Sequence, residues 1–484
     1  MSGRGLTGNL LVTSRNCEWV AWLPHSARTG RIRSLRCVPD SYNPQSVNLN
    51  PLLRRLAMDR ALAYWVLCAI VLFGVAIRLF LSWQWNNNHP NSAARLLGDE
   101  SNYDDIAREM LQGYGVTWPG RAPLYPLWLA GVYWVSGCSY NAVPYAQSLL
   151  GVATIVLTFE LGRRVFGLPA GLLAACAVAI DVALIRHGMV LMTEILYTPI
   201  ILVSVITLWD AMDGRQNWRF ALGGALIGIS NLIRPTLFLF PFAVAIVLWI
   251  RLGRRSALRS GAVFVAAAYL VITPWMVRNY LRYSAVFPIA TSVAVLWQGS
   301  PEYYHLLRDQ GYTYMRVWKD VIYGPLGEGH SPLTIEGDRW WTRRALHSIA
   351  GEPLVYLKYF VEKLGTYWVG DPNADWANSY VFNYRIMAIY FGHQYAAVLM
   401  VARVMPGFAL LSCLILRRQW RLLLPVYSLL SYCTLLHAAT HAEVRLSEPF
   451  HPLLLILIGG AVQHLLAPPA TPWPPEDRQC QSLR

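Results

Sequence analysis

Residues 61–82 read ALAYWVLCAIVLFGVAIRLFLS, an almost uninterrupted apolar run. A helix needs about 20 mainly apolar residues to cross a bilayer, so this run predicts a membrane span. Further candidate spans lie at roughly 142–160, 167–185, 194–209, 220–233, 235–250, 261–279, 394–416, 422–440 and 450–467. We interpret a Pro-rich apolar patch at 122–136 as re-entrant or as part of a longer helix. The pattern predicts an all-α polytopic membrane protein with about ten or more transmembrane helices.

The composition agrees with lipid as the solvent. The chain is 55% hydrophobic and 14% charged, whereas a soluble domain is about 25% charged. Its net charge of +14 is the kind of value seen in nucleic-acid-binding proteins. The arginines, however, fall in short clusters between apolar runs, as in the cytoplasmic loops of membrane proteins. We therefore expect membrane lipid around the chain and no nucleic-acid partner.

The positions of the charged residues also predict on which side of the membrane each loop lies. The residues before the first span include Arg54, Arg55 and Arg60, so the N-terminal tail is expected in the cytoplasm. Alternation of the spans puts the other basic loops on the same side: Arg163 to Arg164, Arg215 to Arg219, Arg251 to Arg259 and Arg417 to Arg421. The opposite side receives the acidic residues Asp99, Glu100, Asp104, Asp105, Glu194, Glu443 and Glu448. We expect a multi-pass protein of the cell inner membrane with both termini cytoplasmic.

The same pattern divides the chain into five parts. Residues 1–55 are a disordered basic cytoplasmic tail, and 56–280 form an N-terminal transmembrane catalytic module with a first outer loop at 83–122. The mixed, Tyr- and Trp-rich segment 281–393 is interpreted as a small outer (periplasmic) domain. Helices of a C-terminal transmembrane part occupy 394–467, and 468–484 are a second cytoplasmic tail.

The first outer loop carries an amphipathic pattern. Ser101 followed three residues later by Asp104 resembles a capping box, and the apolar residues after it share one helical face. The pattern predicts a helix lying along the outer membrane surface. Asp99 and Glu100 stand at its start, where the helix dipole favours ionised carboxylates. Such a group can accept a proton or hold a metal. We interpret Asp104 and Asp105 as solvated helix-start acids, and for Asp99 both interpretations stay open.

Other charged residues are expected at the same membrane face. Arg121 lies in the run Gly120-Arg121-Ala122-Pro123-Leu124-Tyr125-Pro126, whose two prolines argue against a regular helix. Glu194 opens a span, where a carboxylate is costly without a partner or a task. Arg234 precedes Pro235, and Arg445 precedes Pro449 and Pro452. Arginines can clamp a lipid phosphate while a carboxylate activates a hydroxyl. The alternative is that these are ordinary interfacial charges at span ends.

The order of these motifs resembles the C-type membrane glycosyltransferase superfamily, in its protein O-mannosyltransferase-like and aminoarabinose-transferase-like branch. The run Gly98-Asp99-Glu100-Ser101-Asn102-Tyr103, with Ile106-Ala107 and Gly113, looks like that superfamily's first outer loop. The run from Arg121 to Pro126, Thr193-Glu194, Arg234-Pro235 and Arg445 with its prolines look like later landmarks. The resemblance covers most of residues 60–465.

That resemblance implies transfer of a sugar from a polyprenyl-phosphate donor to a hydroxyl acceptor on the non-cytoplasmic face, with inversion. It implies Asp99 as the catalytic base, with Glu100 assisting it or helping to bind a divalent metal. Arg121, Arg234 and Arg445 would bind the donor phosphate, with Glu194 and Tyr125 in support. The alternatives are a transporter or flippase, or a polysaccharide ligase, handling polyprenyl-linked sugars. A transporter should carry ionisable residues deep within spans or inverted repeats.

Overall fold

The computed structural model describes residues 59–96, 98–214, 216–324, 327–371 and 403–466. Both predicted cytoplasmic tails and the end of the predicted outer domain lie outside these residues. Every regular element in the described part is helical. The predicted all-α class is therefore confirmed, and each candidate span coincides with helix at least in part.

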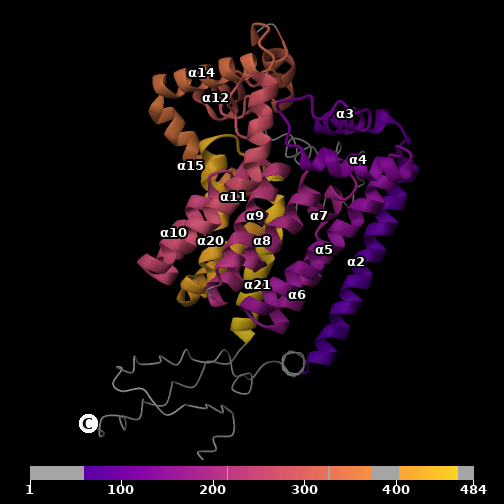
Figure 1. The fold of residues 1–484 in the computed structure, drawn as a ribbon, viewed down its shortest axis with the longest axis vertical. Helices are drawn as coiled ribbons and strands as arrows, with labels where there is room; N and C mark the ends of the chain where they lie inside the picture. The colour runs from indigo at the N-terminus through magenta and orange to yellow at the C-terminus, as the bar shows by residue number, and fades with distance from the viewer. Residues whose placement is uncertain (1–58, 97, 215, 325–326, 372–402, 467–484) are drawn as a thin grey trace, which may run out of the picture. The chain divides into compact units, whose positions relative to one another are not determined.

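The helices appear in three groups along the chain (Figure 1). The first group comprises α2 (Arg60–Asn88), α3 (Asp99–Leu111), α4 (Leu124–Ser136), α5 (Ala142–Val165), α6 (Leu168–Ile180), α7 (Val182–His187), α8 (Glu194–Gly214), α9 (Asn217–Ile233), α10 (Phe240–Leu252) and α11 (Arg254–Tyr283). The second comprises α12 (Pro301–Arg308), α13 (Tyr314–Arg316), a π-helical turn (Val317–Ile322), α14 (Ile335–Gly351) and α15 (Pro353–Val369). The third comprises α19 (Met405–Ile415), α20 (Trp420–Ala439) and α21 (His451–Leu466).

Six helical segments in the described residues are long and apolar enough to cross a membrane, which makes this a multi-pass membrane protein. They are Arg60–Asn88, Ala142–Val165, Glu194–Met212, Arg254–Tyr283, Arg417–Ala439 and Val444–Leu466. Shorter apolar helices are α6, α10 and α19. A 13-residue helix such as α6 is about 20 Å long, less than the roughly 30 Å of hydrocarbon. The count of about ten or more spans stays a prediction.

Two local predictions from the sequence are wrong. The candidate span 167–185 is broken, because Asp181 ends α6 and caps α7 by accepting a hydrogen bond from the Leu184 amide at 3.1 Å. The prolines after Arg121 do not prevent a regular helix: α4 begins at Leu124, and Pro126 lies in its first turn. Proline is tolerated there because first-turn amides have no partner within the helix.

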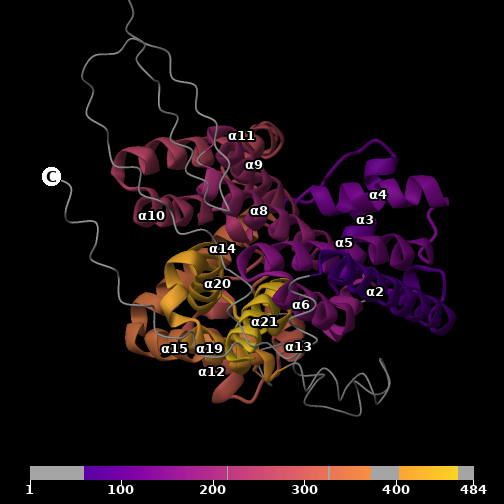
Figure 2. The same ribbon diagram turned by 90° about the horizontal axis from the view of Figure 1, so that it is seen from below.

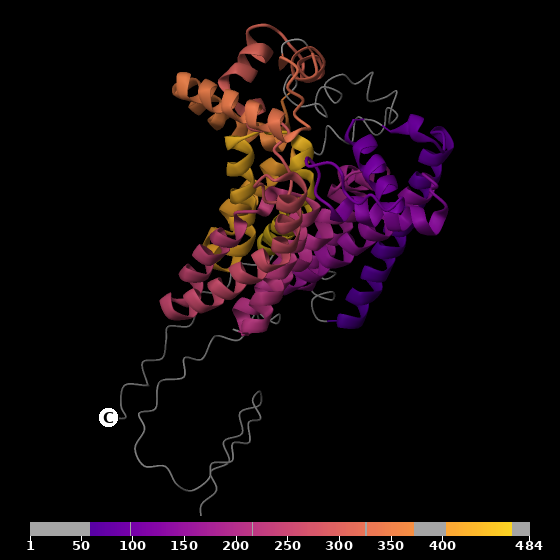
Figure 3. The same ribbon diagram turned by 45° about the horizontal axis from the view of Figure 1, so that its top comes forward.

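The helix ends form two sets, and each set contains an ion pair. The carboxyl end of α9 and the amino ends of α8 and α21 meet through ion pairs described below. At the opposite ends, Arg164 of α5 pairs with Asp210 of α8, and Arg251 of α10 donates to the carbonyl oxygen of Arg421 at 3.0 Å. Figures 1 and 3 show α3, α12 and α14 at the same end of the long helices. The ends that carry Glu194 and Arg234 therefore lie opposite the ends that carry Arg164 and Arg251.

Close packing fixes the helices that carry the site. Helix α8 packs between α5 and α9 (Figure 2). Helix α9 lies directly on α11, because a Cβ atom on Gly224 would overlap the carbonyl oxygen of Phe264. Small residues permit such backbone approach between membrane helices. The contact holds the end of α9, and therefore Arg234, at a fixed place beside the start of α8.

Candidate active site

Helix α3 begins at the first candidate residue. Gly98 is its N-cap, with φ of +59°, a conformation that glycine adopts without a Cβ clash. The Ser101 hydroxyl donates to the Gly98 carbonyl at 3.0 Å instead of accepting an amide hydrogen bond. The predicted Ser101–Asp104 capping box is therefore wrong, and the N-cap lies three residues earlier, at Gly98. Asp99 is the first residue of the helix.

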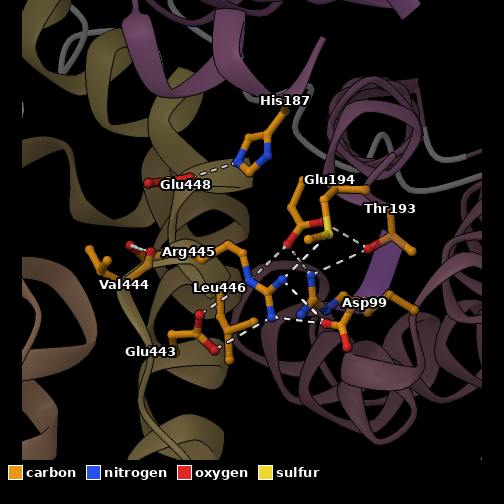
Figure 4. Close-up of polar contacts among 12 residues, drawn as sticks. Asp99, His187, Thr193, Glu194, Glu443, Val444, Arg445, Leu446 and Glu448 are labelled. Atoms are coloured by element: carbon orange, nitrogen blue, oxygen red, sulfur yellow. Dashed lines mark hydrogen bonds and ion pairs between the residues drawn. The ribbon is translucent and has the colours of Figure 1, made fainter. Parts of the chain in front are cut away.

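The Asp99 carboxylate lies between two arginine side chains from distant parts of the chain. Arg121 Nη2 donates to its Oδ1 at 2.6 Å, and both Nη atoms of Arg445 lie 3.3 Å from its Oδ2. Figure 4 shows Asp99 and Arg445 pointing toward each other. The Asp99 side chain nevertheless remains 35% exposed. A bound molecule can therefore reach the carboxylate while two cations hold it.

Arg445 also joins two further carboxylates (Figure 4). Its Nε lies 3.2 Å from Oε1 of Glu443 and 3.8 Å from Oε1 of Glu194. The same Glu194 oxygen pairs with Arg234 Nη1 at 2.8 Å. Unlike Asp99, the Glu194 side chain is only 1% exposed. We call the set the ion-pair cluster: Asp99, Arg121, Glu194, Arg234, Glu443 and Arg445.

Electrostatics keep the cluster ionised. Burial alone would raise the pKa of the Asp99 carboxyl group, but the charges of Arg121 and Arg445 lower this pKa below its usual value. Burial alone would also raise the pKa of the Glu443 carboxyl group, but the charge of Arg445 lowers this pKa below its usual value. The pKa values of Arg121 and Arg234 are raised, because Asp99 and Glu194 outweigh the effect of burial. At neutral pH the cluster contains three carboxylates and three guanidinium groups.

Two predicted site residues lie outside the cluster. Glu100 is buried, and its Oε1 accepts a hydrogen bond from the Leu191 amide at 2.7 Å. Tyr125 is fully buried, and its hydroxyl donates to Gln147 Oε1 at 2.9 Å. The Gln147 amide in turn donates to the carbonyl oxygen of Val190 at 2.9 Å. Both residues therefore support the segment that leads into Glu194.

A further ion pair anchors the segment that carries Arg445. Arg186 Nη2 and His187 Nε2 each lie 2.6 Å from Oε2 of Glu448. All three side chains are buried. This contact ties α7 to the short turn that precedes α21. In sequence, Glu443 and Glu448 were recognised only as acids of the outer side, although their two- and three-residue spacing from Arg445 was a usable signal.

The interpretation of Asp104 as a solvated acid is wrong. Its side chain is 4% exposed and accepts hydrogen bonds from the Tyr133 and Tyr140 hydroxyls at 2.7 and 2.8 Å. Arg108 Nε pairs with it at 3.0 Å. Asp104 therefore ties α3 to α4 and to the start of α5. Asp105, as expected, is exposed.

The second group of helices also reaches the cluster. The ring of Tyr314 stacks on buried His441, with ring centroids 6.0 Å apart. His441 Nε2 lies 3.7 Å from Oε2 of Glu443. No motif in the sequence pointed to Tyr314. His441, by contrast, directly follows the candidate span 422–440 and lies two residues before Glu443, which was a usable signal.

A divalent metal does not fit the arrangement of the Asp99 carboxylate. Among the described residues there is no group of three or more His, Cys, Asp or Glu side chains placed to hold a metal ion. The oxygens of Asp99 contact guanidinium groups, whereas hard divalent cations need several oxygen ligands. We therefore assign no step to a metal.

The fold and the site define a polytopic membrane protein with a partly buried, charge-balanced ion-pair cluster at one end of its helices. Residues 120–277 match the family model of dolichyl-phosphate-mannose-protein mannosyltransferases. This match, to a family of the C-type glycosyltransferase superfamily, confirms the superfamily that the motifs indicated.

Solved structures were also compared. The chain is similar to the archaeal oligosaccharyltransferase AglB from Archaeoglobus fulgidus, in complex with an inhibitory peptide and a dolichol-phosphate, at 15% identity and a TM-score of 0.49. That match covers 83% of this chain and 50% of AglB, so the chain spans about half the length of that relative. It is also similar to ArnT from Cupriavidus metallidurans bound to undecaprenyl phosphate, at 15% identity and a TM-score of 0.37, covering 81% of this chain and 77% of ArnT. No curated protein matches the chain.

Proposed function

We propose that this chain is a membrane glycosyltransferase that moves a sugar from a polyprenyl-phosphate donor to a hydroxyl acceptor on the non-cytoplasmic face, with inversion. The observation that carries the proposal is the partly exposed Asp99 carboxylate held between Arg121 and Arg445. The family match supports the class of donor, because dolichyl phosphate is a polyprenyl-type phosphate.

In the proposed reaction the acceptor oxygen attacks the anomeric carbon from the side opposite the phosphate. The bond from that carbon to the phosphate oxygen breaks, and polyprenyl phosphate leaves with the bonding electrons. Asp99 takes the acceptor proton. Its lowered pKa makes it a weak base, but an attacking hydroxyl becomes strongly acidic as it bonds to an electron-poor carbon. A weak base that stays ionised is therefore sufficient for late proton transfer.

The arginine side chains bind the phosphate of the leaving group. A guanidinium group has five N–H donors and can bind two oxygens of one phosphate. Arg445 and Arg234 each contact Glu194, and we expect the donor phosphate to bind beside this pair on the exposed side of Asp99. Positive groups placed where charge develops stabilise the transition state more than the ground state. Glu100, Glu194 and Tyr125 are assigned to positioning these groups.

The proposal includes the cellular placement. We place the protein in the inner membrane with both termini cytoplasmic and segment 281–393 outside, because the basic helix ends lie opposite the cluster. The domain boundaries predicted from the sequence belong to the same proposal.

The direct test is an assay of purified protein in lipid vesicles with a labelled polyprenyl-phosphate sugar and a panel of hydroxyl acceptors. A transferase releases free polyprenyl phosphate in step with a labelled product. A flippase moves the donor across the vesicle membrane and leaves the sugar–phosphate bond intact. A polysaccharide ligase shows turnover only with a glycan acceptor. Donor movement without cleavage in every acceptor condition would sink the transferase assignment.

A further inference from the structure

A strained turn lies between the second helical group and Arg121. Val293 and Ala294 have φ values of +48° and +60°, and the Val295 amide donates to the Ser292 carbonyl at 3.0 Å. Two positive φ values at the centre of a four-residue turn normally require Gly or Asn. For a β-branched residue such as valine this backbone is a genuine outlier. Local sequence preference therefore does not explain the turn.

One carboxylate holds the turn in place. Oδ1 of Asp338, in the first turns of α14, accepts hydrogen bonds from the Ser292 amide at 2.9 Å, the Ser292 hydroxyl at 2.6 Å and the Val293 amide at 3.1 Å. Hydrogen bonds to an ionised acceptor are stronger than neutral ones. Three of them on one oxygen can maintain a conformation that the local sequence disfavours.

The turn packs against Gly120, the residue before Arg121. The Thr291 amide donates to the Pro119 carbonyl at 2.9 Å. A Cβ atom on buried Gly120 would lie 3.1 Å from Cγ2 of Val293, which is tighter than ordinary contact. The turn and the backbone at 119–120 therefore fit against each other without free space. Arg121 follows directly and reaches Asp99.

We propose that Asp338 is a positioning residue for the reaction: by holding the strained Ser292–Val295 turn against Gly120, it sets the place of Arg121 beside Asp99. Strained backbone persists only where surrounding structure over-determines it, and it concentrates at functional sites. The inference rests on the proposed function only for the catalytic meaning of Arg121. The mechanical link from Asp338 to Gly120 stands on its own contacts.

Glycine substitution gives a specific rescue test. Asp338→Ala removes the acceptor, so the turn should relax and the backbone near Gly120 should loosen. Ala294→Gly relieves part of the strain, because glycine adopts positive φ freely, and it keeps the Val293 side chain that packs against Gly120. The double variant Asp338→Ala with Ala294→Gly should therefore depend less on the carboxylate. Glu336→Ala is the matched control, since Glu336 is an exposed acid in the same first turn of α14.

The measurement is hydrogen–deuterium exchange of full-length protein in lipid nanodiscs, read for peptides covering 115–125 and 288–296. Loss of the acceptor should speed exchange by about tenfold in both regions, and adding Ala294→Gly should restore slower exchange at 115–125. Unchanged exchange at 115–125 in Asp338→Ala, or no restoration by Ala294→Gly, would overturn the link. Should Asp338→Ala not fold, Asp338→Asn keeps an oxygen acceptor and should show a smaller change in the same two regions.

Activity separates this inference from the proposed function. If the transferase assignment is correct, Asp338→Ala should lower kcat by about tenfold with normal expression, Glu336→Ala should leave it unchanged, and the double variant Asp338→Ala with Ala294→Gly should recover part of it. If the wild-type protein transfers no sugar, the proposed function fails, and the exchange result still decides whether Asp338 positions Arg121. Slow exchange restored without recovery of kcat in an active enzyme would reject the catalytic role.

Discussion

The guanidinium group of Arg445 meets the carboxylate of Asp99 across 346 positions of sequence, with both of its Nη atoms 3.3 Å from the same oxygen. Asp99 starts a short helix after the first span. Arg445 lies in the 3-10 turn Val444–Leu446, which precedes α21. The contact therefore joins the beginning of the membrane part of the chain to its end. The predictions below test what each charge in it does.

Replacing Asp99 by Asn should remove the proton acceptor and preserve the shape of the side chain. A positioned general base contributes a factor of about 100 to 10,000 in rate, so turnover of a labelled polyprenyl-phosphate sugar should fall by that amount. Asp105→Asn is the control, because Asp105 is exposed on the same helix. Asp99→Asn membranes that retain about half of the wild-type rate or more, well outside the general-base range, would place the base elsewhere.

Arg445→Lys and Arg234→Lys should each weaken donor binding although the positive charge is kept. Lysine offers a compact point charge and cannot bridge several oxygens in the planar geometry of a guanidinium group. We expect about a tenfold loss of affinity for polyprenyl phosphate in the Lys variants and a larger loss with Ala. Arg255→Lys, at the opposite helix ends and exposed, should change nothing. Equal donor affinity in all of these proteins would make the two arginines interfacial anchors.

The acid side of the pH–rate profile should report the charge of Arg121. The Asp99 pKa is lowered below its usual value, so the working carboxylate is present above that pKa and is lost as the pH falls through it. The acid limb of the wild-type profile should therefore lie below the pH range in which an ordinary aspartic acid takes up its proton. Arg121→Gln removes the charge that lowers this pKa most, and the acid limb should move to higher pH. Superimposable normalised profiles would show that Asp99 does not control the rate.

Asp104→Ala should destabilise the protein, since it leaves two buried tyrosine hydroxyls without their acceptor and removes the ion-pair partner of the partly exposed Arg108. A buried donor left without a partner typically costs about 1–3 kcal/mol. The thermal unfolding midpoint in detergent should drop clearly, while Asp105→Ala should leave it unchanged. Equal midpoints for the two variants would mean that the Asp104 network contributes no net stability.

Membrane sidedness can be tested by cysteine labelling in intact cells. In a protein without its eight native cysteines, Met315→Cys should react with an impermeant reagent and Trp218→Cys should not. Both positions are exposed. The proposed topology places them on opposite sides of the membrane. Labelling at position 218 with none at position 315 would show that the topology is the reverse of the proposed one.

The sequence was sufficient to predict most of a cluster of distant residues. Apolar runs define the spans, and alternation then brings six charged residues to one face: Asp99, Glu100, Arg121, Glu194, Arg234 and Arg445. Ion pairs join five of them, whereas Glu100 accepts a hydrogen bond from the Leu191 amide. The roles assigned to them stay predictions, because proton transfer and phosphate binding depend on a substrate.

Other features could not be predicted from local pattern. The burial of Asp104 depends on two tyrosine donors about 30 residues away, which a helix-start pattern does not contain. Glu100 and Asp99 are neighbours, yet successive residues on a helix point about 100° apart. Glu100 accepts a hydrogen bond from the Leu191 amide, a contact that the local pattern does not contain. The Val293–Ala294 turn contradicts local preference outright, because Asp338 supplies the deciding interactions.

The composition of the ion-pair cluster has a consequence for biosynthesis. Asp99, Arg121, Glu194 and Arg234 leave the ribosome on the order of tens of seconds before Arg445. That first set contains two acids and two arginines, and Glu443 arrives two residues ahead of Arg445. Each half is therefore electrically neutral by itself, and the nascent chain can insert its early helices without an uncompensated charge at the edge of the lipid, where such a charge is costly. Docking of α20 and α21 then brings the neutral pair of Glu443 and Arg445 to the neutral first set.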